Sequence, residues 1–581
     1  MFRSLANRLA PPLFLTLLCA GLYLPGLGVP SLWDIDEGHN AQAAREMLEA
    51  GTWITPTFNY QLRVDKPALL YWLQMCGYLT LGIDEFSARL PSALAALLTV
   101  LLTYALGRRC FDPGTALLGA VVLASSLLFS GSAHFANPDA LLNACNVLTF
   151  LLVWIGLQAG HARWLGWVGV STGLGFLAKG PVALVLPAAV VLLFLLWTRQ
   201  LRRLLSARLL QGCFLFALVA VPWFALVGSE TKGAYLRGFF LKHNRDRFLN
   251  PLEGHSGPIV YHVGSLLLGF LPWSVFLGPA LWCAWKEWRR GRAASQEVPS
   301  TEYLVPSPGN AEPTGKALAP AIAHPELSTP LPALKFLICW IAVYFVFFSL
   351  SRTKLPNYIL PLYPAVALLT AWFLQGWRRG ELPVPRWLMT SSLACWALVG
   401  VCTSVGLLTA SGVIELSLLK GRSLPGLEVG VFLGLLPVLG AGAAWLCWKR
   451  EATVGMLGAL AVSAVLFGFS LMTWGSAALD AHKAPRSLVA QADAKQLHRE
   501  VRIGCYGWYQ PSLVFYCERE VQQLLSEQQA LEFLRSPLEV YLFVPKQIWE
   551  GLEGKVSGPS RLLARQRCLY RNCEVVVISN R

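Results

Sequence analysis

Residues 182–203 read VALVLPAAVVLLFLLWTRQLRR, an apolar run that ends at Trp197 and is followed at once by Arg199, Arg202 and Arg203. An apolar run of this kind can cross a bilayer core as a helix, and short arginine-rich loops stay on the cytoplasmic side. The same pair of features recurs along most of the chain. The pattern therefore predicts a polytopic α-helical membrane protein.

The composition of the whole chain agrees with this prediction. Of its 581 residues, 55% are hydrophobic and only 14% are charged, whereas soluble domains have about 25% charged residues. The formal net charge of +15 would suggest nucleic-acid binding in a soluble protein. Here the lysines and arginines lie in short loops between apolar runs, which is a topogenic pattern. We therefore expect the lipid bilayer as a partner and no nucleic acid.

The apolar runs predict about 13 spans. Arg3 and Arg8 place the N-terminus in the cytoplasm, and the first span lacks a clear cleavage site, so we read it as uncleaved. Alternation of the basic loops then places the C-terminus outside. The predicted spans are 11–27, 90–106, 115–130, 140–157, 164–178, 182–197, 209–227, 259–285, 334–350, 356–374, 387–410, 427–448 and 453–474.

Two domains are predicted, a transmembrane domain over 1–475 and a small α/β domain over 476–581 on the non-cytoplasmic side. The first contains two long outer loops, 30–89 and 228–258, and a Pro-, Ser- and Ala-rich cytoplasmic linker, 292–332. In the first loop, residues 37–48 predict an amphipathic helix at the membrane surface. The small domain is expected to hold strands at 501–505, 513–516, 540–544 and 574–578 and helices at 491–497 and 524–534.

Four cysteines lie in this outer domain. The expected compartment is oxidising, so Cys505 with Cys517, and Cys568 with Cys573, are candidate disulfides, and four free thiols are the alternative. The remaining cysteines lie mostly in apolar runs, where cysteine behaves as a small hydrophobic residue.

Ionisable residues are scarce in the spans and gather in segments on the outer side. A site for a phosphate-linked lipid at the membrane surface needs cations for the phosphate and a carboxylate to take a proton from the acceptor. The outer segments supply both. Their members are Asp34, Asp36, Glu37, His39 and Arg45; Arg63, Asp65 and Lys66; His134 and Asp139; Lys179; Lys242, His243, Arg245, Asp246, Arg247, Glu253 and His255; and Arg352 and Lys354.

Each of these residues also has a purely structural interpretation. Asp36 and Glu37 could cap the helix that follows them, and Lys179 could extend its ammonium to the interface from the end of a span. Arg352, Lys354 and His255 could be ordinary loop residues. The sidedness that they share favours the functional interpretation.

Several motifs resemble those of the bacterial aminoarabinose transferases of lipid A, members of the protein O-mannosyltransferase-like superfamily with the GT-C fold. The resemblance covers nearly the whole chain. Its motifs are WDxDE at 33–37, AREM at 44–47, GTWIxP at 51–56, DKPxxxYW at 65–72, AKG at 178–180, LPW at 271–273 and KLPxYxLP at 354–361.

The resemblance implies direct transfer of a sugar from undecaprenyl phosphate, with inversion at the anomeric carbon. It implies catalytic carboxylates, with Asp36 the leading candidate and Glu37 and Asp139 beside it. The implied contacts to substrate and phosphate are His39, Lys66, Lys179, Arg247, Arg352, Lys354 and Tyr358.

A divalent metal ion such as zinc is a further implication. In the family, a glutamate before the lysine of the Lys-Pro motif can hold such an ion together with a loop histidine. Asp65 replaces that glutamate here and His255 falls in a similar loop; carboxylate and imidazole are both zinc ligands. A second departure is His39, which stands where the family has an arginine, a residue that grips phosphate in bidentate fashion.

We therefore expect a glycosyltransferase of the bacterial inner membrane, with a polyprenyl-phosphate-linked sugar as donor and lipid A or another envelope glycolipid as acceptor. Protein O-glycosylation is the alternative within the enzymes. A lipid or sugar transporter is the alternative of another class, but transporters place ionisable residues in mid-membrane and often show repeated halves, and neither feature is evident in this sequence.

Overall fold

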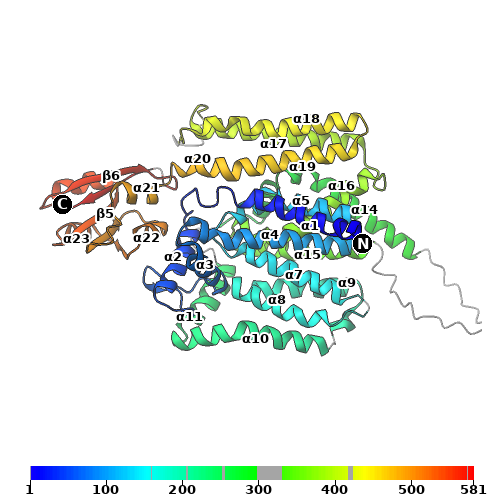
Figure 1. Cartoon of the computed structure of the whole chain (residues 1–581), viewed down its shortest axis with the longest axis horizontal. Coiled ribbons are helices and arrows are strands. Elements are labelled where there is room, and N and C mark those ends of the chain that lie inside the picture. The colour runs from blue at the N-terminus through cyan, green and yellow to red at the C-terminus, as the bar shows by residue number, and fades with distance from the viewer. Residues whose placement is uncertain are drawn as a thin grey trace, which may run out of the picture.

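The computed structural model describes residues 2–158, 160–204, 207–250, 256–296, 330–415, 423–571 and 573–581. A bundle of long helices forms most of the molecule, and a small sheet domain lies at one end of it (Figure 1). The helices at the outer loops and in the first half of the bundle are α1 (Phe2–Tyr23), α2 (Asp36–Glu49), α3 (Leu69–Leu81), α4 (Glu85–Cys110), α5 (Pro113–Ala124), α6 (Leu127–Ala133), α7 (Asp139–Gly156), α8 (Trp164–Lys179), α9 (Val182–Trp197), α10 (Ala207–Glu230), α11 (Ala234–Arg237) and α12 (Arg247–Leu249).

The second half of the bundle continues with α13 to α20. Their bounds are α13 (Tyr261–Gly269), α14 (Leu277–Gln296), α15 (Pro330–Leu350), α16 (Tyr363–Arg378), α17 (Arg386–Ser411), α18 (Leu435–Lys449), α19 (Thr453–Ser470) and α20 (Ser476–Asp480).

Eight of the described helices are long and apolar enough to cross a membrane, and up to ten spans result if two bent pairs are counted as one span each. The polytopic helical class is thereby confirmed, whereas the predicted count of about 13 spans exceeds the eight to ten found among the described residues. The bent pairs correct two single spans predicted from sequence. Residues 115–130 divide into α5 and α6 at an angle of 68°, and 259–285 divide into α13 and the helix that follows at 111°. Pro272 lies in the second break, where it has no N–H to continue a helical ladder.

The bundle has a buried centre and an apolar exterior. Within its most apolar stretch, α7 is 89% buried, whereas the corresponding share is 22% for α10 and for α17. Exposed apolar side chains such as Leu210 and Phe214 cover α10. Such a surface is stable in contact with lipid, because the backbone N–H and C=O groups of a helix are hydrogen-bonded within the helix itself. Glycines bring α10 close to α8: a Cβ added to Gly169 would lie 1.9 Å from the Gly212 carbonyl oxygen.

The C-terminal domain is a five-stranded sheet with the strand order β4-β3-β5-β7-β6. Strand β3 pairs in parallel with β4 and β5, and β7 pairs antiparallel with β5 and β6. Parallel neighbours need a crossover, which α22 and α23 supply. The bounds are α21 (Ala484–Gln491), β3 (Val501–Tyr506), α22 (Ser512–Cys517), β4 (Val521–Leu524), α23 (Glu527–Leu534), β5 (Glu539–Pro545), α24 (Lys546–Leu552), β6 (Arg561–Arg567) and β7 (Glu574–Ser579).

Two predictions within this domain are wrong. Residues 513–516 form part of α22 rather than a strand, and the helix expected over 491–497 is α21, which ends at Gln491. Neither candidate disulfide is present: all four cysteines are free thiols, which was the alternative. Three of these thiols, Cys505, Cys517 and Cys568, are packed in the apolar core of the domain. The strands at 501–505, 540–544 and 574–578 are confirmed.

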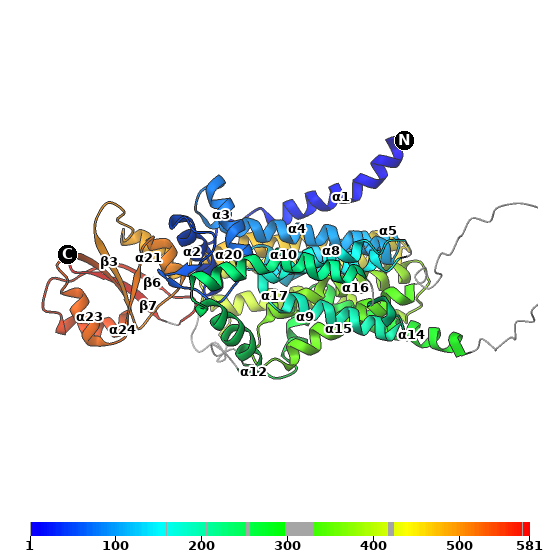
Figure 2. The same ribbon diagram turned by 90° about the horizontal axis from the view of Figure 1, so that it is seen from below.

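The first outer loop and the sheet domain lie at the same end of the bundle. Helices α2 and α3 adjoin the sheet domain, while the N-terminus and α14 lie at the opposite end (Figures 1 and 2). The helix expected over 37–48 is present as α2, but it is buried between α3 and α22 rather than open along one side. A two-stranded hairpin, β1 (Thr57–Phe58) and β2 (Gln61–Leu62), follows it.

Candidate functional site

The first turn of α2 carries the two acidic residues that the sequence singled out, and they lie in different surroundings. Asp36 is half-buried, and its charge acts on the guanidinium of Arg63 and on the imidazole of His39. Glu37 is fully buried. Only Asp36 is therefore accessible to a second molecule.

Glu37 holds the first outer loop together. Its two carboxylate oxygens accept hydrogen bonds from the guanidinium of Arg89 at 2.9 and 2.8 Å, and also from the backbone N–H groups of Ala136 and Trp33. Arg89 is itself 0% exposed and donates further to three carbonyls of residues 27–31. A buried charge needs such a complete set of partners. We therefore propose that Glu37 has a structural role, instead of the catalytic role expected from the sequence.

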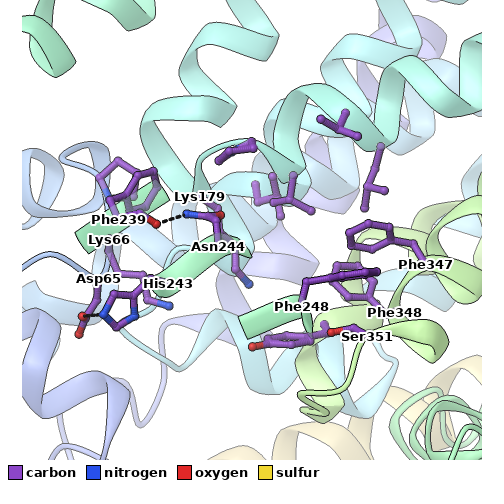
Figure 3. A pocket seen from close by; sticks show the side chains of 17 residues that line it. Asp65, Lys66, Lys179, Phe239, His243, Asn244, Phe248, Phe347, Phe348 and Ser351 are labelled. Atoms are coloured by element: carbon purple, nitrogen blue, oxygen red, sulfur yellow. Dashed lines mark hydrogen bonds and ion pairs between the residues drawn. The ribbon is translucent and has the colours of Figure 1, made fainter. Parts of the chain in front are cut away.

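A cavity of about 220 Å³ lies where the ends of several helices meet, among them the end of α8 and the start of α9. Figure 3 shows a polar side, with Asp65, Lys66, Lys179, His243 and Asn244, and an aromatic side. Four of the predicted site residues, Asp65, Lys66, Lys179 and Tyr358, line it. The other lining residues are Pro67, Leu142, Pro181, Val182, Val185, Leu186, Phe239, His243, Asn244, Phe248, Phe347, Phe348 and Ser351.

Lys179 reaches the cavity because α8 ends there. Gly180 follows with φ +74° and lies against the ring of Phe239, where an added Cβ would come within 2.5 Å of it. Only glycine adopts that backbone without strain, and Pro181 is then the N-cap of α9. The Lys-Gly-Pro sequence is thus a tight turn between two helices, α8 and α9, that presents one cation at its tip.

The ammonium of Lys179 is bonded to the carboxylate of Asp139, the first residue of α7. Asn357 donates to the other oxygen of Asp139 at 2.7 Å. The ammonium also lies 5.4 Å from the ring centroid of Tyr358, within the range of a cation–π contact. The pairing of Lys179 with Asp139 is the structural alternative to a phosphate contact, and the cavity position of Lys179 is compatible with both.

In a second polar cluster, the carboxylate of Asp65 contacts two basic side chains. His243 and Asp65 are 2.8 Å apart, from Nε2 to Oδ1, and Arg63 is 3.3 Å from the other carboxylate oxygen. Burial acts to raise the pKa of Asp65, but the hydrogen bond from His243 and the charge of Arg63 outweigh it and hold that pKa well below its usual range. The charge of Asp36 also acts on Arg63 and favours its protonated form. Charged groups therefore extend from the start of α2 to the cavity.

Three other predicted contacts lie elsewhere. The ring of His39 packs against Phe58 with centroids 4.3 Å apart, and burial and the charge of Arg63 lower its pKa to about 4. Lys354 is 4% exposed and donates to the carbonyls of Phe348 and Ser349 at the end of α15, a capping role. Arg352 is exposed. None of these three lines the cavity.

Two predicted residues fall where the structure gives no description. His255 lies outside the described residues, and so does the side chain of Arg247, although its backbone starts α12. The imidazole that faces Asp65 within the described part of the chain is that of His243. Asp65 and His243 supply two donors of a kind that zinc accepts, but no third His, Cys, Asp or Glu joins them among the described residues. Arg63 places a positive charge against the same carboxylate.

The aromatic wall and Asn244 were not predicted from the sequence. Phe239, Phe248, Phe347 and Phe348 are ordinary apolar residues in a chain that is 12% aromatic, so no local pattern distinguishes them. His243 was visible as part of the basic cluster in the second outer loop. Its distinction from its neighbours is its contact with Asp65, and that contact joins residues far apart in sequence.

The chain is similar in sequence to known glycosyltransferases. Residues 65–225 match the family described as dolichyl-phosphate-mannose-protein mannosyltransferase. The chain is 35% identical over 361 residues to the undecaprenyl phosphate-α-4-amino-4-deoxy-L-arabinose arabinosyl transferase of Pseudomonas aeruginosa (strain UCBPP-PA14), covering 61% of this chain and 58% of that protein. A counterpart from Erwinia tasmaniensis is 29% identical over 364 residues, 62% of this chain and 58% of that protein. The aligned region therefore spans about three fifths of the curated relatives.

Solved structures show the same fold. ArnT from Cupriavidus metallidurans bound to undecaprenyl phosphate superposes with a TM-score of 0.74 at 22% identity, covering 99% of this chain and 98% of that one. The archaeal oligosaccharyltransferase AglB from Archaeoglobus fulgidus gives a TM-score of 0.52 at 12% identity, covering 94% of this chain and 70% of that one. The match to ArnT extends over the membrane bundle and the C-terminal sheet domain alike.

Proposed function

We propose that this chain transfers a sugar from a polyprenyl phosphate to an acceptor at the periplasmic surface of the inner membrane. The proposal rests on its ArnT-type glycosyltransferase fold and on its sequence similarity to aminoarabinose transferases. The donor we propose is undecaprenyl-phosphate-linked 4-amino-4-deoxy-L-arabinose, the sugar of the similar enzymes. The proposed acceptor is lipid A. The proposed location is the bacterial inner membrane, with the N-terminus cytoplasmic and the sheet domain periplasmic.

The observation that carries this proposal is the two-sided cavity. Its polar side holds two lysines, Lys66 and Lys179, and its other side is formed by phenylalanine and aliphatic side chains. A polyprenyl phosphate combines an anion with an apolar chain, so both halves of the ligand find suitable partners. The hydroxyl of Tyr235 donates to the carbonyl of Lys66 at 2.8 Å and so fixes the backbone from which that ammonium projects.

In the reaction we propose, an acceptor hydroxyl attacks the anomeric carbon of the sugar and the bond from that carbon to the phosphate oxygen breaks. Asp36 takes the proton of the hydroxyl as general base. The phosphate leaves with an additional negative charge, which the lysines of the cavity stabilise. Attack opposite to the leaving group inverts the anomeric configuration. Asp139 keeps Lys179 in place through their ion pair.

The residues that the sequence assigned to phosphate contacts contribute differently in this proposal. Lys66, Lys179 and Tyr358 form the phosphate side of the cavity, and Arg247 of the second outer loop is a further candidate. A zinc ion held by Asp65 and His243 would supply a positive charge beside the phosphate, and no step above depends on it.

The test is mass spectrometry of lipid A and other envelope glycans from a strain that lacks this protein. Loss of an aminoarabinose substituent on lipid A, restored by the wild-type gene, is the expected result. Unchanged lipid A with a lost glycan on envelope proteins would instead favour protein O-glycosylation, the alternative that the match to the mannosyltransferase family suggests.

A further inference from the structure

Asp34, two residues before the candidate base Asp36, is bound almost entirely by the C-terminal domain. Its Oδ1 accepts a hydrogen bond from the backbone N–H of Ser512 at 2.8 Å, and its Oδ2 accepts one from the hydroxyl of the same residue at 2.6 Å. Its backbone N–H donates to the hydroxyl of Tyr570 at 3.0 Å. Both carboxylate oxygens and the amide of Asp34 thus have partners more than 470 residues away in sequence.

Ser512 also touches α2 on the far side of Asp36. A Cβ added to Gly38 would lie 2.5 Å from the nitrogen of Ser512 and 2.8 Å from its Cα. The backbone of α2 therefore presses directly on the start of α22, with no room for a side chain. Asp36 lies between Asp34 and Gly38 in the sequence, so a single residue of the C-terminal domain fixes the chain on both sides of it.

The rest of α2 is attached to the same domain. Arg45 forms an ion pair with Glu518 at 2.9 Å and donates to the carbonyl of Phe515 at 3.2 Å. Before α2, the ammonium of Lys483 lies 3.8 Å from the ring centroid of Trp33. The contacts at both ends tie α2 to the sheet domain, although α2 belongs to the first outer loop and also packs against α3.

We propose that Asp34 and Ser512 are positioning residues, through which the C-terminal domain fixes Asp36 in the orientation that proton transfer requires. The inference rests on the proposed function, because it needs Asp36 as the base. A displacement of about 1 Å between reacting groups can lower a rate on the order of 100-fold. Among the described residues that line the cavity, none belongs to the C-terminal domain, so in this proposal the domain affects the rate without forming the donor site.

The charge of Asp34 gives the contact a pH dependence. Burial raises the pKa of Asp34 to about 6, and the Ser512 hydrogen bonds and the charge of Lys483 oppose that rise. The other ionisable groups that face it are Glu37 from α2 and Tyr509 and Tyr570 from the C-terminal domain. Removal of the Ser512 hydroxyl would raise this pKa further, because the ionised carboxylate would lose one donor.

The experiment compares Ser512→Ala with the control Ser526→Ala, both in the full chain in lipid nanodiscs. The hydroxyl of Ser526 caps α23 in the same domain and accepts from the amide of Gln529. Two quantities are measured for each variant: hydrogen exchange of the amides of residues 36–40, and kcat and KM for transfer from the undecaprenyl-phosphate-linked sugar.

Ser512→Ala is expected to speed amide exchange in residues 36–40 and to lower kcat about tenfold with an unchanged KM for the donor. The acid limb of its pH–rate profile is expected to move to higher pH, whereas Ser526→Ala remains like the wild type. Unchanged exchange overturns the inference whether or not the protein is active. Faster exchange with unchanged kcat, or an equal loss of kcat in both variants, overturns it as well. Faster exchange in a protein whose wild type transfers no sugar would contradict the proposed function and leave the contact itself confirmed.

Discussion

Lys179 and Asp139 form an ion pair at the wall of the cavity, and the side chain of Asp139 is only 3% exposed, whereas the side chain of Lys179 is 17% exposed and lines the cavity. A phosphate that binds Lys179 must therefore share the ammonium with Asp139. The pair keeps the cation in place in the absence of a ligand, because a lysine has too many rotamers to hold one position unaided. The contribution of the ion pair to stability can be separated from its contribution to binding.

Lys179→Met should lower the stability of the protein by about 3 kcal/mol, because it leaves a buried carboxylate without its cation. The double variant Lys179→Met/Asp139→Asn should recover most of that loss. Thermal melting of the two single variants and the double variant in detergent gives the coupling energy. Additive losses in the double variant would mean that the two groups do not interact in the folded protein.

Lys66→Met should weaken the binding of undecaprenyl phosphate while the melting temperature changes little, because Asp65 retains Arg63 and His243 as partners. Loss of one charge-assisted contact corresponds to roughly 10-fold in Kd. A binding titration beside a melting curve measures both, and Lys546→Met, an exposed lysine of α24, is the control. An unaltered Kd for Lys66→Met would remove this lysine from the phosphate site.

Glu37→Gln should destabilise the protein by about 3 kcal/mol, because the substitution leaves the guanidinium of Arg89 buried without its counter-charge. The matched control is Glu550→Gln, which neutralises an exposed carboxylate on α24. Thermal melting distinguishes the two. A Glu37→Gln protein that is as stable as the wild type but inactive would show that Glu37 has a catalytic rather than a structural role.

The lowered pKa of His39 predicts that the folded protein loses stability in mild acid. Burial and the charge of Arg63 lower its folded pKa to about 4 from a usual value of 6.5, so the unfolded chain binds a proton that the folded chain does not. Its contribution is complete above pH 6.5 and is lost as the pH falls towards 4. In His39→Asn the melting temperature should depend less on pH in this window, whereas the exposed His498→Asn should behave like the wild type. Identical pH profiles for all three proteins would contradict the assignment.

Local sequence patterns predicted much of this molecule, because a lipid-exposed helix is specified by its own composition. Helix α2 and the end of a helix near Lys179 were identified from local patterns, whereas the four predicted residues that line the cavity were implied by the family resemblance. The apolar run at 513–516 misled, because Leu, Val, Phe and Tyr favour strands. In the folded chain Asp34 accepts from the amide of Ser512, the residue just before that segment, and the segment is helical.

The roles that could not be predicted depend on long-range contacts. The structural role of Glu37 could not be recognised from the sequence around it, because its partner Arg89 is 52 positions away. His243 was one histidine among several basic residues until the fold placed it against Asp65. The separation of Asp36 from Glu37, one half-buried and the other enclosed, follows from the direction in which each side chain leaves α2.

The central claim is tested most directly by reconstituted transfer. The purified chain in nanodiscs is given undecaprenyl-phosphate-linked 4-amino-4-deoxy-L-arabinose and lipid A, and the product is measured by mass spectrometry for the wild type and for Asp36→Asn. We predict modified lipid A with the wild type and a rate lower by about 100-fold or more with Asp36→Asn, with undecaprenyl phosphate binding and melting temperature preserved in the variant. Transfer by Asp36→Asn at the wild-type rate would contradict the assignment of the base, and the absence of any sugar transfer by the folded wild type would contradict the proposed function.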